Sequence, residues 1–273
     1  MSEEIYSARR SPDKVHYKIV KCQRCGLIFS SPIFTAKKLS KFYEKSACNY
    51  QNQIPYLVKT YFKIIEQIKK DLPKNPSVLE VGCGNGFFLK ALVGSGFSKN
   101  VFGVEPSLKM ASKADKVLFG RIKTDVFKTT LFPKNMFDLV LCFHTLDHMF
   151  DPKEFIVGAY KMLKKNGYVI VVVHDTDGLS VKLFGEKSAI FDIEHIYLFN
   201  KKTLSEIFLR NNFKIIKIFD LINNYPLNYW LRMSGFPGFI KRCIEFIFNT
   251  LRINKRELSI PAGNIALIAK KNV

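Results

Sequence analysis

Three alternating glycines directly after a short apolar stretch constrain the fold more than any other feature of this chain. Residues 78–88 read VLEVGCGNGFF, and the glycines are Gly82, Gly84 and Gly86. Ser77–Val81 is predicted to form a strand, and a helix is predicted from Phe87 to about Gly94. Glycines at such a junction let the backbone turn sharply and approach a ligand with no Cβ in the way. The pattern therefore predicts a strand–loop–helix ligand site.

Two common nucleotide-binding loops do not fit this stretch. The dinucleotide pattern G-x-G-x-x-G requires glycine at position 87, where this chain has Phe87. A Walker loop requires a lysine followed by serine or threonine, and that pair does not follow here. Both readings are therefore excluded.

Strand and helix signals alternate around the loop. Helices are predicted over Leu57–Leu72 and Glu154–Leu163, the second ending at an Asn or Gly cap within residues 164–167. Further strands are predicted over Asn100–Val104, Leu118–Ile122, Phe137–Phe143 and Tyr168–Val173. The stretch from Phe137 to Phe143 is almost continuously apolar, as expected of a strand covered on both faces. Alternating strands and helices indicate parallel βαβ units, so the fold class is α/β.

Three acidic residues follow the predicted strands in order. Glu80 lies in the first strand end, Glu105 closes the second strand, and Asp125 follows the weak third one. A carboxylate at the position of Glu105 can accept hydrogen bonds from both ribose hydroxyls of a nucleoside. Each acid alone is more often a loop or cap residue, but their common order and spacing favour a nucleoside site.

The spacing E-x-G-x-G-x-G from Glu80 to Gly86 resembles motif I of class I S-adenosylmethionine-dependent methyltransferases. Residues 137–152, FDLVLCFHTLDHMFDP, resemble the strand-four segment of the same family, with Asp147 in place of the usual glutamate. The resemblance implies a Rossmann-like, seven-stranded, mostly parallel sheet with helices on both faces and an antiparallel last strand. It also implies S-adenosyl-L-methionine as the cofactor.

The resemblance further implies a role for each acid. In this family the residue at Glu80 orders the loop and its cationic ligand, and the residue at Asp125 bonds the adenine amino group. The implied cofactor-binding residues are Glu80, Gly82, Cys83, Gly84, Gly86, Phe87, Glu105, Pro106, Asp125, Val126, Phe143 and His144. No metal ligand is expected.

Residues 192–213 resemble a segment of a methyltransferase group that includes sugar C-methyltransferases and ubiquinone-biosynthesis-type O-methyltransferases. Glu194 and His195 are the predicted acid–base pair, because a histidine beside a carboxylate can hold a pKa near neutral and take a proton. The alternative is that the pair only fixes the loop before a helix. His174, at the end of a predicted strand, is the third predicted catalytic residue. His148 is expected to cap or buttress the loop that follows it.

The chain is expected to divide near residue 55. Residues 1–55 form an N-terminal segment with a Lys-rich cap helix over Ala36–Tyr43, and residues 56–273 form the methyltransferase domain. The stretch around Cys22 and Cys25 resembles the second half of a four-ligand zinc ribbon. Two thiolates cannot complete a tetrahedral zinc site, and the spacing to His16 is unconvincing. A metal-free remnant knuckle is expected, unless a longer N-terminus or a dimer supplies ligands.

A helical insert is predicted over about residues 224–256, which are aromatic and basic. From Phe239 to Leu251 its apolar residues form a broad face. Such a segment can contact a membrane surface peripherally, through about residues 224–253. The alternative is an insert packed over the sheet or between the subunits of a homo-oligomer.

The formal net charge is +20. It favours a phosphate-bearing substrate, an anionic lipid surface or nucleic acid, or it reflects only solvating lysines. Nucleic acid is disfavoured because the Asp/Asn-Pro-Pro-aromatic tetrad and the Pro-Cys nucleophile of base methyltransferases are missing. The N-terminal residues do not read as a signal peptide, and the six cysteines lack disulfide-framework spacing. A cytoplasmic location is therefore expected.

The sequence thus predicts methyl transfer from S-adenosylmethionine to a small polar metabolite. The leading hypothesis is C- or O-methylation of a nucleotide-linked sugar in surface-polysaccharide biosynthesis. The alternatives are O-methylation of a phenolic or quinone-like compound, or a non-catalytic binding protein that retains the fold. The intact acids Glu80, Glu105 and Asp125 argue against the last.

Overall fold

A seven-stranded sheet forms the centre of the computed structural model, which describes residues 15–44 and 51–272. The strands lie in the order β5-β4-β3-β6-β7-β12-β9. Their bounds are β3 (Val78–Val81), β4 (Val101–Val104), β5 (Ile122–Lys123), β6 (Phe137–Phe143), β7 (Leu163–His174), β9 (Phe213–Asp220) and β12 (Asn264–Lys271). Strand β12 is antiparallel to both of its neighbours, while β3 to β7 pair in parallel. The predicted Rossmann-like fold with an antiparallel last strand is confirmed.

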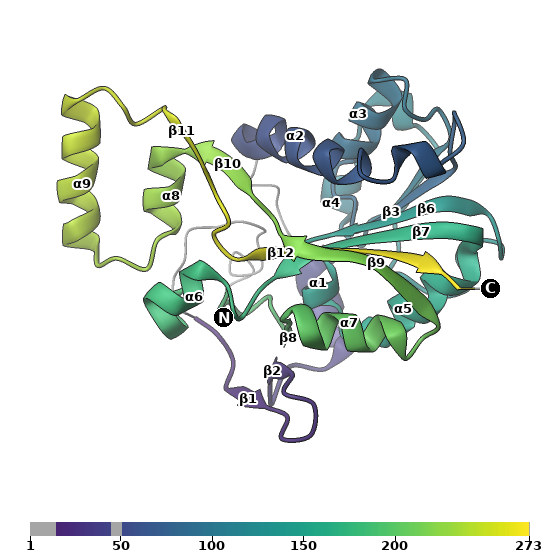
Figure 1. The fold of residues 1–273 in the computed structure, drawn as a ribbon, viewed down its shortest axis with the longest axis horizontal. Helices are drawn as coiled ribbons and strands as arrows, with labels where there is room; N and C mark the ends of the chain where they lie inside the picture. The colour runs from purple at the N-terminus through teal and green to yellow at the C-terminus, as the bar shows by residue number, and fades with distance from the viewer. Residues whose placement is uncertain (1–14, 45–50, 273) are drawn as a thin grey trace.

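Helices cover both faces of this sheet (Figure 1). On one face lie α2 (Ile54–Ile65) and α3 (Phe87–Gly94), and on the other lie α5 (Pro152–Met162) and α7 (Lys201–Leu209). Neighbouring residues of one strand join opposite cores: Leu139 packs with the α2–α3 side, and Val140 packs with the α5–α7 side. Side chains alternate across a strand, so a strand between two helical layers must be apolar throughout. This explains the unbroken apolar run of β6.

Three predicted elements end differently from expectation. The helix predicted over Leu57–Leu72 is α2, which ends at Ile65 and is followed by a separate 3-10 turn over Lys69–Asp71. The predicted strand Leu118–Ile122 is instead a 3-10 turn over Lys116–Leu118 and a two-residue strand, because the chain turns at Gly120 with φ +70°. Helix α5 ends at Met162, and β7 begins at the next residue. Asn166 takes a left-handed φ of 63°, but it lies inside β7 rather than capping the helix. The predicted Asn or Gly helix cap is therefore wrong.

The N-terminal segment is tied to the rest of the chain by a separate three-stranded sheet. Strands β1 (Ile19–Lys21) and β2 (Ile28–Ser30) form a hairpin, and β2 also pairs with β8 (Tyr197–Leu198). Helix α1 (Ala36–Glu44) buries Leu39 against Ile193 and Ile196. The segment thereby packs on the loop that carries His195.

The predicted insert contains two helices closed by a strand pair. Strands β10 (Asn223–Pro226) and β11 (Glu257–Ile260) pair antiparallel, and α8 (Leu227–Met233) and α9 (Gly238–Thr250) lie between them. Figure 1 shows α9 as the outermost element, with α8 between it and the rest of the molecule. Among the described residues, no helix combines the length and apolar character needed to cross a bilayer.

Candidate active site

The glycine loop between β3 and α3 requires glycine for steric as well as conformational reasons. Gly82 and Gly86 have φ values of 75° and 71°, which side chains rarely adopt. A Cβ on Gly82 would lie 2.2 Å from Thr145 Oγ1, and one on Gly86 would lie 2.5 Å from Leu118 Cδ1. The missing side chains therefore let the loop pack closely against its neighbours.

Glu105 at the end of β4 holds this loop in place. Its Oε2 accepts a hydrogen bond from the Gly84 N–H at 2.8 Å, and its Oε1 accepts one from the Ser107 N–H at 2.9 Å. The carboxylate is buried, and this burial raises its pKa. Each carboxylate oxygen has a second lone pair, and Glu105 lines a cavity. It can therefore order the loop and also accept hydrogen bonds from the hydroxyl groups of a ligand.

Glu80 is a buried carboxylate with an unsatisfied oxygen. Its side chain lines the same cavity, and Oε2 has no hydrogen-bond partner among the described residues. Burial, and then the nearby Glu105 charge, raises the pKa of Glu80 well above its usual value. A buried charge is stable only when it is paired. A cationic ligand such as the methionine part of S-adenosylmethionine would supply that partner, so these residues fit the predicted cofactor.

The structure brings most of the predicted cofactor residues to this cavity, but not all of them. Those that line it are Glu80, Gly82, Gly84, Phe87, Glu105, Pro106, Val126, Phe143 and His144. Asp125 is not among the lining residues, and its carboxylate is 3.0 Å from Lys128 Nζ at the surface. Cys83 is buried beside Gly103, and Gly86 caps α3.

The cavity has a volume of about 820 Å³ and extends well beyond the glycine loop. We call the part around Glu80, the glycine loop and Glu105 the cofactor end. The opposite part, the acceptor end, is bounded by α1, by α8 and by α6 (Leu179–Phe184). Its apolar walls include Leu183, Phe184, Tyr225, Tyr229, Trp230 and Met233. Among the described lining residues, Lys37 is the one lysine or arginine.

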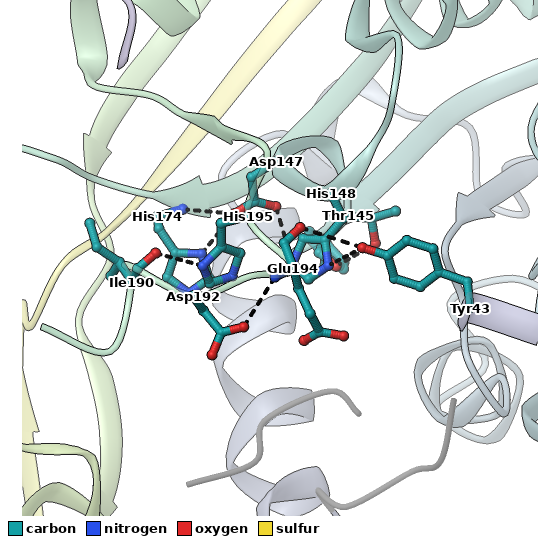
Figure 2. Close-up of polar contacts among 10 residues, drawn as sticks. Tyr43, Thr145, Asp147, His148, His174, Ile190, Asp192, Glu194 and His195 are labelled. Atoms are coloured by element: carbon teal, nitrogen blue, oxygen red, sulfur yellow. Dashed lines mark hydrogen bonds and ion pairs between the residues drawn. The ribbon is translucent and has the colours of Figure 1, made fainter. Parts of the chain in front are cut away.

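At the acceptor end three imidazoles surround one buried carboxylate (Figure 2). Asp147 Oδ2 accepts a hydrogen bond from His174 Nδ1 at 2.7 Å, and Asp147 Oδ1 lies 3.7 Å from His148 Nε2. The His195 ring centre is 4.3 Å from that of His174 and 4.8 Å from that of His148. Burial alone would raise the pKa of Asp147, but the three imidazoles hold it below its usual value.

The protonation of His195 follows from its contact. Its Nδ1 is 2.6 Å from the carbonyl oxygen of Ile190. A carbonyl only accepts, so Nδ1 carries the proton and Nε2 keeps its lone pair. Burial, and then the nearby His174, lowers the pKa of His195. The ring is therefore a neutral base that lines the cavity.

Glu194 does not form the predicted pair with the His195 ring. Its main-chain N–H donates to Asp192 Oδ1 at 3.1 Å, and its carbonyl oxygen accepts from the Tyr43 hydroxyl at 3.4 Å. Figure 2 shows its carboxylate extended away from the His195 imidazole. The carboxylate of the histidine cluster is Asp147 instead. Sequence reasoning missed Asp147 as a site residue, although its position in the TLDH stretch was the available signal.

His148 lies between Asp147 and helix α1. Its Nδ1 lies 3.5 Å from the hydroxyl of Tyr43, which reaches it from α1. Burial, and then repulsion from His195 and His174, lowers the pKa of His148 to about 3, against the attraction of Asp147. Tyr43 was not predicted as a site residue, because nothing local in α1 indicates that it meets residue 148.

Sequence comparison now decides the family. Residues 50–218 match a family described as a methyltransferase domain, which is more than half of the chain. This chain belongs to that family. It is a class I S-adenosylmethionine-dependent methyltransferase.

Two curated relatives match part of the chain, and one of them is named as a methyltransferase. The methyltransferase is 29% identical over 154 residues to an uncharacterized protein of Methanocaldococcus jannaschii, a match that covers 56% of this chain and 65% of that protein. It is 26% identical over 153 residues to a ubiquinone biosynthesis O-methyltransferase of Rickettsia akari, covering 50% of this chain and 58% of the relative. The matches thus span less than two thirds of these relatives' lengths.

The fold is also that of a solved methyltransferase structure. An S-adenosylmethionine-dependent methyltransferase of Archaeoglobus fulgidus superimposes with a TM-score of 0.53 at 20% identity, covering 87% of this chain and all of that one. At this level of identity the likeness supports the fold alone.

The histidine cluster of the methyltransferase also has the spacing of a metal site. Asp147, His174 and His195 each offer one ligand atom, and these atoms lie within 4.8 Å of one another. One carboxylate and two imidazoles suit a divalent transition metal. In the described ranges 15–44 and 51–272, no comparable group includes Cys22 and Cys25 of the N-terminal hairpin.

Proposed function

We propose that this methyltransferase methylates a hydroxyl oxygen of a phenolic or quinone-like acceptor, with His195 as the general base. The observation that carries the proposal is the buried His195 ring. It lines the cavity, donates from Nδ1 to Ile190 and so has Nε2 as a proton acceptor. Neutral imidazole is the form that can remove a hydroxyl proton.

The lining of the acceptor end supports this class of acceptor. Aromatic and apolar side chains dominate its walls, with Tyr229 and Trp230 among them. An aromatic ring binds well against such walls. Several relatives are named as ubiquinone biosynthesis O-methyltransferases, that of Rickettsia akari among them.

A nucleotide-linked sugar is the second candidate acceptor. Asp192, Glu194 and Asn223 line the cavity, and such side chains can accept or donate hydrogen bonds to sugar hydroxyls. A nucleoside diphosphate carries negative charge, however, and Lys37 is the one cation among the described residues lining the cavity. This imbalance favours the phenolic acceptor.

The proposed reaction divides between the two ends of the cavity. Bound S-adenosylmethionine supplies a methyl group on a sulfonium centre that becomes a neutral thioether. Glu80 and Glu105 would hold this cofactor. At the acceptor end His195 Nε2 takes the proton as the hydroxyl O–H bond breaks and the new O–CH₃ bond forms. Asp147 then stabilises the positive charge that develops on the imidazole cluster.

A product screen tests the proposal. The full chain is incubated with S-adenosylmethionine and with a panel of phenols, catechols and nucleotide sugars, and S-adenosylhomocysteine is measured. Phenolic hydroxyl compounds should give product, and methoxy derivatives of the same rings should not. Product formation only with nucleotide sugars would overturn the acceptor class. A parallel series with EDTA, and with EDTA followed by Zn²⁺ or Mg²⁺, shows whether the Asp147 cluster works with a metal.

A further inference from the structure

Helix α9 presents an apolar face that nothing in the described structure covers. None of its residues is buried, and its partly buried apolar residues Ile240, Ile244 and Phe248 recur every four positions, on the side available to α8. The adjoining face carries Phe239, Cys243, Phe246 and Ile247 at spacings of three and four residues. Phe239 is 63% exposed, Phe246 72% and Ile247 51%. Monomeric proteins rarely expose such a contiguous face without a use for it.

Basic residues flank this face and continue past the end of the helix. Residues 238–256 contain five basic residues and one acidic residue, Glu245. Of the basic residues, Arg242, Arg252, Lys255 and Arg256 are exposed. An apolar face with basic flanks matches an anionic bilayer, where the apolar side chains enter the acyl boundary and the cations meet the headgroups.

We propose that this face of α9 binds the surface of an anionic lipid bilayer. A second copy of the chain would be a poorer partner for this face. Its own basic residues would lie against those of the first copy, and both copies carry a net charge of +20. The helix would lie in the plane of the headgroups rather than cross the bilayer.

The apolar surface continues from α9 to the mouth of the cavity. Leu183 lines the cavity and is 65% exposed, so it lies at the opening. Its neighbour Phe184 contacts Phe236, with ring centres 5.1 Å apart, and Phe236 is itself exposed in the α8–α9 loop. Binding through α9 thus brings the cavity of the proposed function beside the lipid.

Vesicle sedimentation tests the proposal without any methylation readout. The full chain is mixed with vesicles of phosphatidylcholine alone, or with phosphatidylglycerol added, at low and at raised salt. The chain should bind the anionic vesicles and be released by salt. The double variant F239S/F246S should bind these vesicles at least about tenfold more weakly. It lacks the two phenyl rings whose transfer from water into the bilayer would favour binding.

The matched control is Phe119→Ser, which removes a phenyl ring that is 94% exposed outside α9. It should bind vesicles as the wild type does. All variants should keep their affinity for S-adenosylhomocysteine, which shows that they are folded. The proposal is overturned if the wild type stays in the supernatant with anionic vesicles. It is also overturned if F239S/F246S binds them equally well, or if that pair instead abolishes a dimer seen by sedimentation velocity.

Discussion

The two ends of the cavity are built from sequence in different ways. At the cofactor end, Glu80, the glycine loop and Glu105 lie within one strand–loop–helix–strand unit, and the hydrogen bond from Gly84 to Glu105 spans 21 residues. At the acceptor end, Tyr43 reaches His148 across 105 residues, and Asp147 meets His174 across 27. The first site is a local motif, while the second exists only after the sheet has assembled.

The two ends also differ in what they lack. Glu80 Oε2 at the cofactor end has no described partner, so a cationic ligand would relieve a buried charge. At the acceptor end Asp147 Oδ1 also has no hydrogen-bond partner among the described residues, but Oδ2 accepts a hydrogen bond from His174, and His148 Nε2 lies 3.7 Å from Oδ1. Changes at the cofactor end should therefore weaken cofactor binding, and changes at the acceptor end should slow the chemistry.

The sharpest test of this division is His195→Ala. Removal of the general base should lower kcat by about 10²–10⁴-fold. The affinity for S-adenosylhomocysteine, measured by calorimetry, should stay within about twofold, because His195 belongs to the acceptor end of the cavity and not to the cofactor end. His16→Ala, outside the cavity lining, is the control. An equal loss of cofactor affinity and turnover would make His195 structural.

The counterpart at the cofactor end is Glu105→Ala. This change leaves the Gly84 and Ser107 N–H groups without their acceptor. S-adenosylhomocysteine should bind about 10- to 100-fold more weakly, because buried donors without partners are costly. Glu105→Gln keeps one carbonyl acceptor and should lose less. Unchanged affinity in both variants would contradict the role given to Glu105.

The acceptor end should also give stability a pH dependence. Burial lowers the pKa of His148 to about 3, from an ordinary value of 6.5. Below pH 6.5 the unfolded chain binds a proton on this imidazole that the folded chain does not bind. The free energy of unfolding should therefore decrease as the pH is lowered from 6.5 to 4, by up to about 1.4 kcal/mol per pH unit.

His148→Gln removes this titrating group, so the slope should become shallower. Urea denaturation at several pH values measures it. Part of the slope should remain, because the pKa of His195 is also lowered by burial. An unchanged slope in the variant would show that His148 is protonated in the folded state.

The smallest effect is expected for Asp125→Ala. The carboxylate pairs with Lys128 at the surface and does not line the cavity. Loss of an exposed ion pair should change cofactor affinity by about twofold or less. A tenfold loss, measured by calorimetry, would instead assign Asp125 the adenine contact that the family resemblance implies.

The fold was largely predictable from the sequence. The strands β3, β4 and β6 agree with prediction to within a residue at each end, because unbroken apolar runs between turn signals have few alternatives. The errors are at the end of the predicted helix Leu57–Leu72, at Leu118–Ile122 and at Asn166. In the last two places a left-handed residue changes the chain direction, and local patterns did not distinguish a turn or bulge from a strand or helix cap.

The site was predictable only in part. The residue next to His195 in sequence, Glu194, was expected to be its partner, but both residues lie in a turn closed by the hydrogen bond from the His195 N–H to the Asp192 carbonyl oxygen, and the Glu194 carboxylate extends away from the imidazole (Figure 2). The carboxylate that does meet the histidines comes from the turn after β6, which lies beside β7 because those two strands are neighbours in the sheet.

The sequence by itself determined the parallel α/β sheet, the glycine loop and the two carboxylates that face the cofactor end. These features depend on local turn chemistry and on strand periodicity, both of which are written in consecutive residues. Only the tertiary structure decided that Asp147, His174 and His195 form one cluster, that Asp125 lies outside the cavity, and that α9 exposes its apolar face. Such outcomes depend on which strands become neighbours and which helix faces remain uncovered, and neither is set by nearby residues.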